Sequence, residues 1–136
     1  MNLPEISERL RTQDNRCTAD PMFCMQIKVR DVGYYSGLVD NHCWRTEDAE
    51  SDTLYDGDPG FAVPEGEEWD CYGYVDRWET VMVAFTERGC QEFLELDGHN
   101  VRARAFRGEV RIYAESFRRC PEMLAIRAAL LAGGAL

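Results

Sequence analysis

Apolar residues recur at every second position in parts of the chain, a pattern that predicts β-strands. The first such part is residues 21–32, PMFCMQIKVRDV, and the last is residues 109–116, EVRIYAES. Between them, residues 71–86 read CYGYVDRWETVMVAFT and end in a run that is apolar on both faces. Such a run favours a central strand covered on both sides, with a bend near Arg77 that would divide it. A further strand is expected within residues 33–45, reached by a hairpin.

Helical spacing of apolar residues marks three other segments. Residues 1–13 are expected to form a short helix that either docks on the body or extends as an arm. Residues 86–98 are expected to form a second helix, with Thr86 as its N-cap and Gly98 as its stop. Residues 121–134 are expected to form the last helix, which begins with a proline and ends at two glycines. The stretch between Gly98 and the final strand is expected to be a loop or an irregular strand.

This order of segments predicts an α+β fold, namely a small antiparallel sheet with two or three helices packed on it. The length of 136 residues and the hydrophobic fraction of 45% suit a single domain over residues 1–136, with residues 1–20 as a candidate appended helix. No apolar run is long enough to cross a bilayer, so no membrane partner is expected. The polar, charged N-terminus is unlike a secretory signal, which makes the cytoplasm the expected compartment.

Charge changes this picture at one place. Residues 46–70, TEDAESDTLYDGDPGFAVPEGEEWD, hold ten acidic and no basic residues, and the rest of the chain is balanced. The formal net charge of −10 therefore resides in this run. Its prolines and glycines argue against a long helix or a central strand, so it is expected to be an acidic loop between strands.

A longer pattern covers a little under half of the chain. GYVDRWETVMVAFTERGCQEFLELDGHN is followed by RIYAESFRR and then by IRAALL. This pattern resembles a family of small phage and prophage proteins of unassigned function. The segments VRARAFRGEV and RCP depart from the family pattern. The resemblance implies a phage or mobile-element origin and supplies no catalytic residues. Because small accessory phage proteins often bind host machinery, it also raises the expectation of an inhibitor.

The acidic run has three interpretations. As a calcium loop beginning at Asp56 it fails, because Gly60 and Phe61 stand where an oxygen ligand and a glycine are needed. As a solvated loop it only keeps the chain soluble. As a mimic of nucleic acid it would present carboxylates, with aromatic anchors, to a basic groove. The residues assigned to that partner-binding surface are Asp52, Tyr55, Asp56, Asp58, Glu65, Glu67, Glu68 and Trp69.

The segment 99–119 gives an alternative, because it carries six arginines and only two acids, with aromatic residues between them. Such a surface can follow phosphates and stack bases. The arginines assigned to nucleic-acid binding are Arg102, Arg104, Arg107 and Arg111. Pairing of these arginines with the acidic run is the competing explanation, and the net charge of −10 opposes binding to a polyanion.

No sequence motif indicates catalysis. His42 and His99 are the only histidines, and neither Cys43 nor Cys90 lies in a motif that would activate a thiol. The six cysteines include no Cys-x-x-Cys pair, so scattered thiols are expected in place of a zinc site. The chain is therefore not expected to be an enzyme or to hold a cofactor or metal.

These observations lead to one hypothesis and two alternatives. The hypothesis is a phage-encoded accessory protein, acting in the host cytoplasm, that binds and inhibits a host defence complex such as a CRISPR effector. It would block or mimic nucleic acid at a basic groove. The alternatives are a nucleic-acid-binding phage regulator that uses residues 99–119 and a phage structural or assembly component. The oligomeric state stays open, and the aromatic residues leave room for a dimer.

Overall fold

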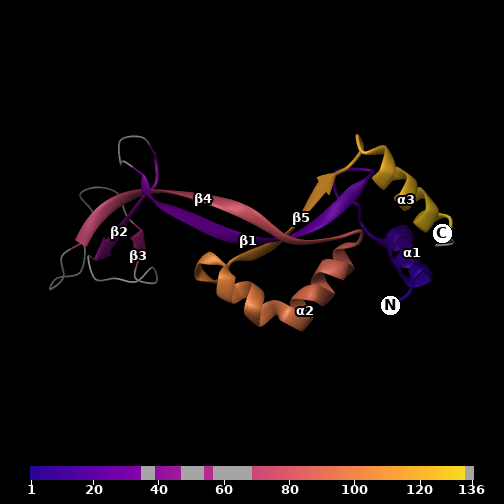
Figure 1. Ribbon diagram of the computed structural model, residues 1–136, viewed down its shortest axis with the longest axis horizontal. Coiled ribbons are helices and arrows are strands. Elements are labelled where there is room, and N and C mark those ends of the chain that lie inside the picture. The colour runs from indigo at the N-terminus through magenta and orange to yellow at the C-terminus, as the bar shows by residue number, and fades with distance from the viewer. Residues whose placement is uncertain (35–38, 47–53, 57–68, 134–136) are drawn as a thin grey trace. The chain divides into compact units, whose positions relative to one another are not determined.

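The computed structural model describes residues 1–34, 39–46, 54–56 and 69–133, and Figure 1 shows the elements that they form. In chain order these are α1 (Leu3–Thr12), β1 (Pro21–Tyr34), β2 (His42–Thr46), β3 (Leu54–Asp56), β4 (Trp69–Ala84), α2 (Glu87–Arg104), the 3-10 helix η2 (Phe106–Gly108), β5 (Val110–Ser116) and α3 (Pro121–Leu131). Three α-helices accompany an antiparallel sheet in these residues, which confirms the predicted α+β class.

The sheet has the strand order β3-β2-β4-β1-β5. Strand β5 pairs antiparallel with β1, from Pro21 opposite Ser116 to Ile27 opposite Val110. Strand β2 pairs antiparallel with both β3 and β4. The strand expected within residues 33–45 is therefore β2, which lies at the end of that segment. Its neighbours in the sheet are β3 and β4, so the predicted hairpin with β1 is wrong. Inside the acidic run, β3 is a three-residue edge strand.

The chain divides into two compact units, and strands β1 and β4 contribute to both. One unit comprises residues 1–28 and 78–136, and the other comprises residues 29–77. The first holds 12 acidic and 12 basic residues and is called the neutral unit below. The second holds 13 acidic and three basic residues, which is a formal net charge of −10, and is called the acidic unit. Compact units and charge thus divide the chain in the same way.

The core of the neutral unit forms where α2 packs on β1 and β5. Phe23, Met25 and Cys90 are fully buried, and Phe93 and Ile112 are among the apolar residues packed against them. Figure 1 shows α2 along one side of these strands. The alternation of β1 and β5 explains the arrangement, because it directs their apolar residues to the side that α2 covers. Thr86 caps this helix as predicted, accepting a hydrogen bond from the Gly89 amide at 3.0 Å.

The first helix docks and is not a free arm. Ser7 and Leu10 of α1 are buried, and α1 lies against α3. The Arg11 guanidinium donates to the Leu131 carbonyl at the end of α3 across 3.4 Å. The terminal segments of the chain therefore form part of the neutral unit.

The predicted stop at Gly98 is wrong, because α2 continues to Arg104. The helix is instead kinked at Asp97, which has φ −129° and ψ 16°, and Asn100 Nδ2 donates to Asp97 Oδ1 at 2.7 Å. Gly98 is buried against Leu94 and Arg102, so its absent side chain serves packing here and not termination. Arg102 and Arg104, which were expected in a loop before the final strand, consequently lie on the last turns of a helix.

Strand β4 also differs from expectation. It continues without a break through the bend predicted near Arg77, although the boundary between the two units falls there. Its apolar end is not covered on both faces, because Val83 is 49% exposed. Val81, Met82 and Ala84 pack against the core, so the cover predicted on both faces is missing at Val83.

All six cysteines are free thiols, and they differ sharply in environment. Cys17 and Cys120 are exposed, whereas Cys24, Cys43 and Cys90 are buried. Burial, with smaller effects of Cys24 and Glu87, raises the pKa of the Cys90 thiol from 9.0 to about 11. The Cys90 thiol donates to the Phe23 carbonyl at 3.3 Å. This thiol is therefore a neutral core group and not an activated nucleophile.

The Cys90 pKa predicts a loss of stability at alkaline pH. The folded protein keeps this proton to higher pH than the unfolded chain does, so the free energy of unfolding should fall as pH rises from 9.0 to about 11. The loss should be at most about 2 kcal/mol, measured by urea unfolding at a series of pH values. In C90A the free energy of unfolding should depend less on pH over this range. An unchanged slope in C90A would show that other groups cause the pH dependence.

Candidate functional site

The residues assigned to the partner-binding surface fall mostly outside the described part of the chain. Asp52, Asp58, Glu65, Glu67 and Glu68 lie there, so their arrangement stays a prediction. Tyr55 and Asp56 belong to β3, and Trp69 begins β4. Among these eight residues, Asp56 is the one whose side-chain contacts the structure describes.

Asp56 contributes to an ion-pair network centred on Arg30 of β1. Nη1 of Arg30 donates to Asp56 Oδ1 at 2.6 Å. Nε and Nη2 of Arg30 donate to the two carboxylate oxygens of Asp76 at 2.7 and 2.9 Å, a bidentate pair. The guanidinium also lies 3.6 Å from the centre of the Tyr74 ring. These contacts join β1, β3 and β4 through one side chain that is only 4% exposed.

The electrostatics of this network follow from burial. Burial by itself would lower the pKa of Arg30, but the hydrogen bonds and charges of Asp76 and Asp56 raise it above its ordinary value. Burial raises the pKa of the Tyr74 hydroxyl, and the nearby Arg30 charge opposes that rise. Arg30 is therefore a permanent cation whose compensation comes from within the acidic unit.

This network changes the role of Asp56. The sequence places Asp56 beside the other acids of the run and so suggests a partner-facing carboxylate. In the structure its carboxylate already neutralises an internal cation, although its side chain is 43% exposed. Asp56 therefore has a structural role in the Arg30 network. Variants that test partner binding by the acidic run should leave Asp56 unchanged. The sequence offers no signal for the pairing, because Arg30, Asp56 and Asp76 are far apart in the chain.

Removing one partner of Arg30 should destabilise the acidic unit in a graded way. D76N removes a bidentate carboxylate from a nearly buried cation and should cost about 3 kcal/mol of unfolding free energy. D56N removes a single, more exposed contact and should cost about 1 kcal/mol. Urea unfolding of both variants measures the difference. An effect of D56N as large as that of D76N would contradict this ranking.

The arginines assigned to nucleic-acid binding do not share one element. Arg102 and Arg104 lie on the last turns of α2, and both are exposed. Arg107 lies in η2 with its guanidinium 4.6 Å from the centre of the Phe106 ring. Arg111 lies on β5, directed to the face of the sheet opposite the α2-covered residues Val110 and Ile112. These four arginines therefore do not lie in one line along a single element.

Arg111 instead belongs to a cluster on three strands of the neutral unit. Its guanidinium lies 4.3 Å from the Trp78 ring centre and 4.7 Å from the Tyr113 ring centre. Its Nε donates to Gln26 Oε1 at 2.7 Å, and Gln26 Nε2 donates to the Thr80 hydroxyl at 3.1 Å. Gln26 is 5% exposed, so its amide is satisfied on both sides beneath the cluster. This chain of contacts holds Arg111 in one orientation between two rings.

Sequence reasoning found only part of this cluster. The alternation over residues 109–116 places Arg111 and Tyr113 on one face, as observed. The contributions of Trp78 and Gln26 depend on the pairing of β1 with both β4 and β5, which the sequence does not specify. One feature of the sequence could have indicated the cluster, namely the polar residue Gln26 within a largely apolar strand. A buried amide needs hydrogen-bond partners, so Gln26 predicts polar groups on the neighbouring strands.

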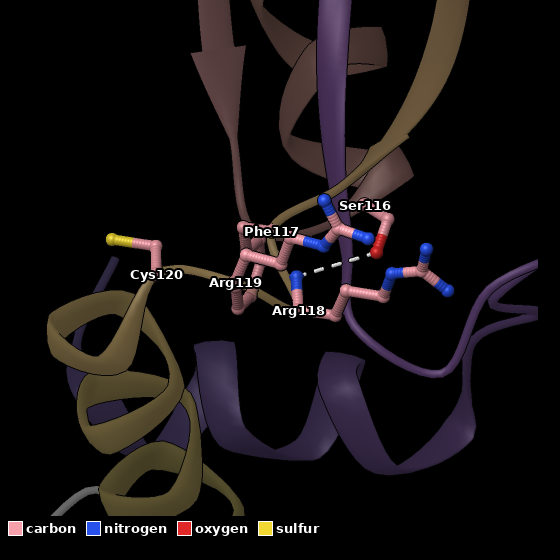
Figure 2. Close-up of a pocket in the computed structure, with 5 residues that line it drawn as sticks. All are labelled: Ser116, Phe117, Arg118, Arg119 and Cys120. Atoms are coloured by element: carbon pink, nitrogen blue, oxygen red, sulfur yellow. Dashed lines mark hydrogen bonds between the residues drawn. The ribbon is translucent and has the colours of Figure 1, made fainter.

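A shallow hollow of about 580 Å³ lies at the turn between β5 and α3 (Figure 2). Ser116, Phe117, Arg118, Arg119 and Cys120 line it. Its backbone is ordered by hydrogen bonds from the Arg118 amide to Ser116 Oγ at 3.3 Å and from the Cys120 amide to the Phe117 carbonyl at 2.9 Å. The Phe117 ring packs edge-on against Phe85, with the ring centres 6.1 Å apart. The two arginines of this turn are exposed to solvent.

The described residues contain no cluster of three or more His, Cys, Asp or Glu side chains that could hold a metal ion. Of the candidate nucleophiles, Cys43 and Cys90 are both fully buried. His99 is exposed on α2, inside the helix and not at its end as the sequence suggested. Burial therefore keeps the Cys43 and Cys90 thiols from contact with a substrate in the described part of the chain.

Comparisons with known proteins find no relationship. No protein-family model matches the chain, and neither curated proteins nor solved structures include one with significant similarity. The resemblance to small phage proteins therefore stays a prediction. Among the described helices, none has the length and apolar character needed to cross a membrane.

Proposed function

We propose that this protein binds and inhibits a macromolecular complex by presenting its acidic unit to a basic, nucleic-acid-binding groove. The activity would be one of binding, without catalysis. The phage origin suggested by the sequence pattern makes a host defence complex, such as an RNA-guided nuclease, the proposed target in the host cytoplasm.

The separation of charge carries this proposal. The acidic unit has 13 acidic residues against three basic ones, and the neutral unit is balanced. Two of its three basic residues are already paired within the unit, Arg30 with Asp56 and Asp76, and Arg77 with Asp31 across 3.0 Å. Most of the remaining carboxylates have no cation of the same unit to pair with, so the unit presents a strong negative field.

Such a field suits a groove built for phosphates. Complementary charge accelerates encounter and orients the partners before contact. A mimic also needs a backbone that keeps its charges in place. The Arg30 network would supply that support, because it joins strands on both sides of the acidic run. The proposal thus divides the acids into structural ones and partner-facing ones.

Neutralising the partner-facing acids should abolish inhibition without unfolding the protein. The variant D58N/E65Q/E67Q/E68Q spares Asp56, so the Arg30 network stays intact. Affinity for the target should fall by at least about 1.4 kcal/mol, or about tenfold, because complementary charge is lost. The measurement is survival of a targeted plasmid in bacteria with different RNA-guided nucleases, followed by displacement of DNA from the purified nuclease.

The matched control removes four exposed acids from the neutral unit in the variant E5Q/E8Q/E95Q/E122Q. It has the same total charge as the test variant and should inhibit as the unaltered chain does. Equal loss in both variants would mean that total charge matters and not the acidic unit. Full inhibition by the test variant would refute the acidic-run mechanism, and the absence of any inhibited nuclease would refute the proposed target class.

A further inference from the structure

One face of the neutral unit's sheet carries exposed polar and aromatic side chains. The α2 helix packs on the opposite face, over Phe23, Met25 and Ile112. On the first face, called the open face below, Tyr113 is 44% exposed and Thr80 is also exposed. Trp78 and Arg111 are half-buried beside them. This face belongs entirely to the neutral unit and so lies apart from the acidic run in sequence and in charge.

Arg111 on this face is a fixed cation without a carboxylate partner in the described residues. Its contacts are the Trp78 ring, the Tyr113 ring and Gln26 Oε1. Only Nε is used in a hydrogen bond to the described residues, so both terminal amino groups remain as donors. Two other cations described in the molecule, Arg30 and Lys28, are by contrast paired with acids. An oriented guanidinium with two unused donors fits a phosphate or a carboxylate in a bidentate manner.

We propose that the open face binds single-stranded nucleic acid, with a phosphate on Arg111 and bases stacked on Tyr113 and Trp78. The two rings stand on β5 and β4, on either side of the central strand β1. Sheets that read single strands present aromatic residues in this way, and stacking tolerates any base because every base has a π-face.

Stacking favours a nucleic acid over an acidic peptide. A carboxylate would satisfy the Arg111 donors but would make no stacking contact of its own with the exposed Tyr113 ring. The neutral unit has no net formal charge, so the charges of its own residues give no net repulsion of a bound polyanion. The site differs from the Arg-rich segment predicted from sequence, because only Arg111 of those four arginines lies on this face.

The experiment measures binding of fluorescein-labelled oligo(dT) and oligo(U), about 12 nucleotides long, to the full chain at about 50 mM and 200 mM salt. We expect micromolar binding that weakens with salt and is accompanied by a change in tryptophan fluorescence. Y113A should weaken it about tenfold, whereas Y113F should preserve it because the ring is kept. R111Q should also weaken binding, and R104Q should not, although it removes the same charge from an exposed position on α2.

Far-UV circular dichroism confirms that each variant is folded. If R111Q is unstable, the affinity of Y113A for the oligonucleotide tests the proposal in its place. Absence of oligonucleotide binding at low salt would overturn the proposal. So would an unaltered affinity of Y113A, or a loss in R104Q equal to that in R111Q. A poly-glutamate peptide of the same length serves as competitor. Displacement of the oligonucleotide by this peptide at equal concentration would show that the face binds acidic protein segments and would also refute the proposal.

Discussion

The ion-pair network of Arg30 is the interaction on which the acidic unit depends. A guanidinium that is only 4% exposed cannot remain charged without compensation, and Asp76 and Asp56 supply it from β4 and β3. Because desolvated charges gain little from pairing alone, the network contributes more to the arrangement of the strands than to net stability. It makes Asp56 and Asp76 structural carboxylates of this unit.

The two units use arginine in opposite ways. In the acidic unit, Arg30 stacks on Tyr74 and is fully neutralised by carboxylates. In the neutral unit, Arg111 stacks on Trp78 and Tyr113, and its one hydrogen bond among the described residues goes to the neutral amide of Gln26. Carboxylates accept hydrogen bonds from Arg30, whereas the terminal amino groups of Arg111 make no hydrogen bond to the described residues. A chain with a strong overall negative charge can therefore still carry a local site for anions.

Packing explains why the fold class was predictable and several details were not. Alternation identified β1 and β5, and spacing identified α1 and α3, because both patterns reflect burial of one face. The Gly98 stop failed because that glycine is used for close packing beside Arg102 inside a kinked helix. The two-sided burial of residues 81–85 failed because an apolar run does not reveal whether a second layer exists, and Val83 remains exposed.

What the sequence determined by itself is the class of the fold, the positions of most elements and the segregation of charge, since each depends on local composition or period. Only the tertiary structure decided which side chains meet. The pairing of Arg30 with Asp56 and Asp76, and the stacking of Arg111 on Trp78, join residues distant in the chain. The physical reason is strand order: the sheet brings β3, β2, β4, β1 and β5 together in a sequence that local patterns do not encode.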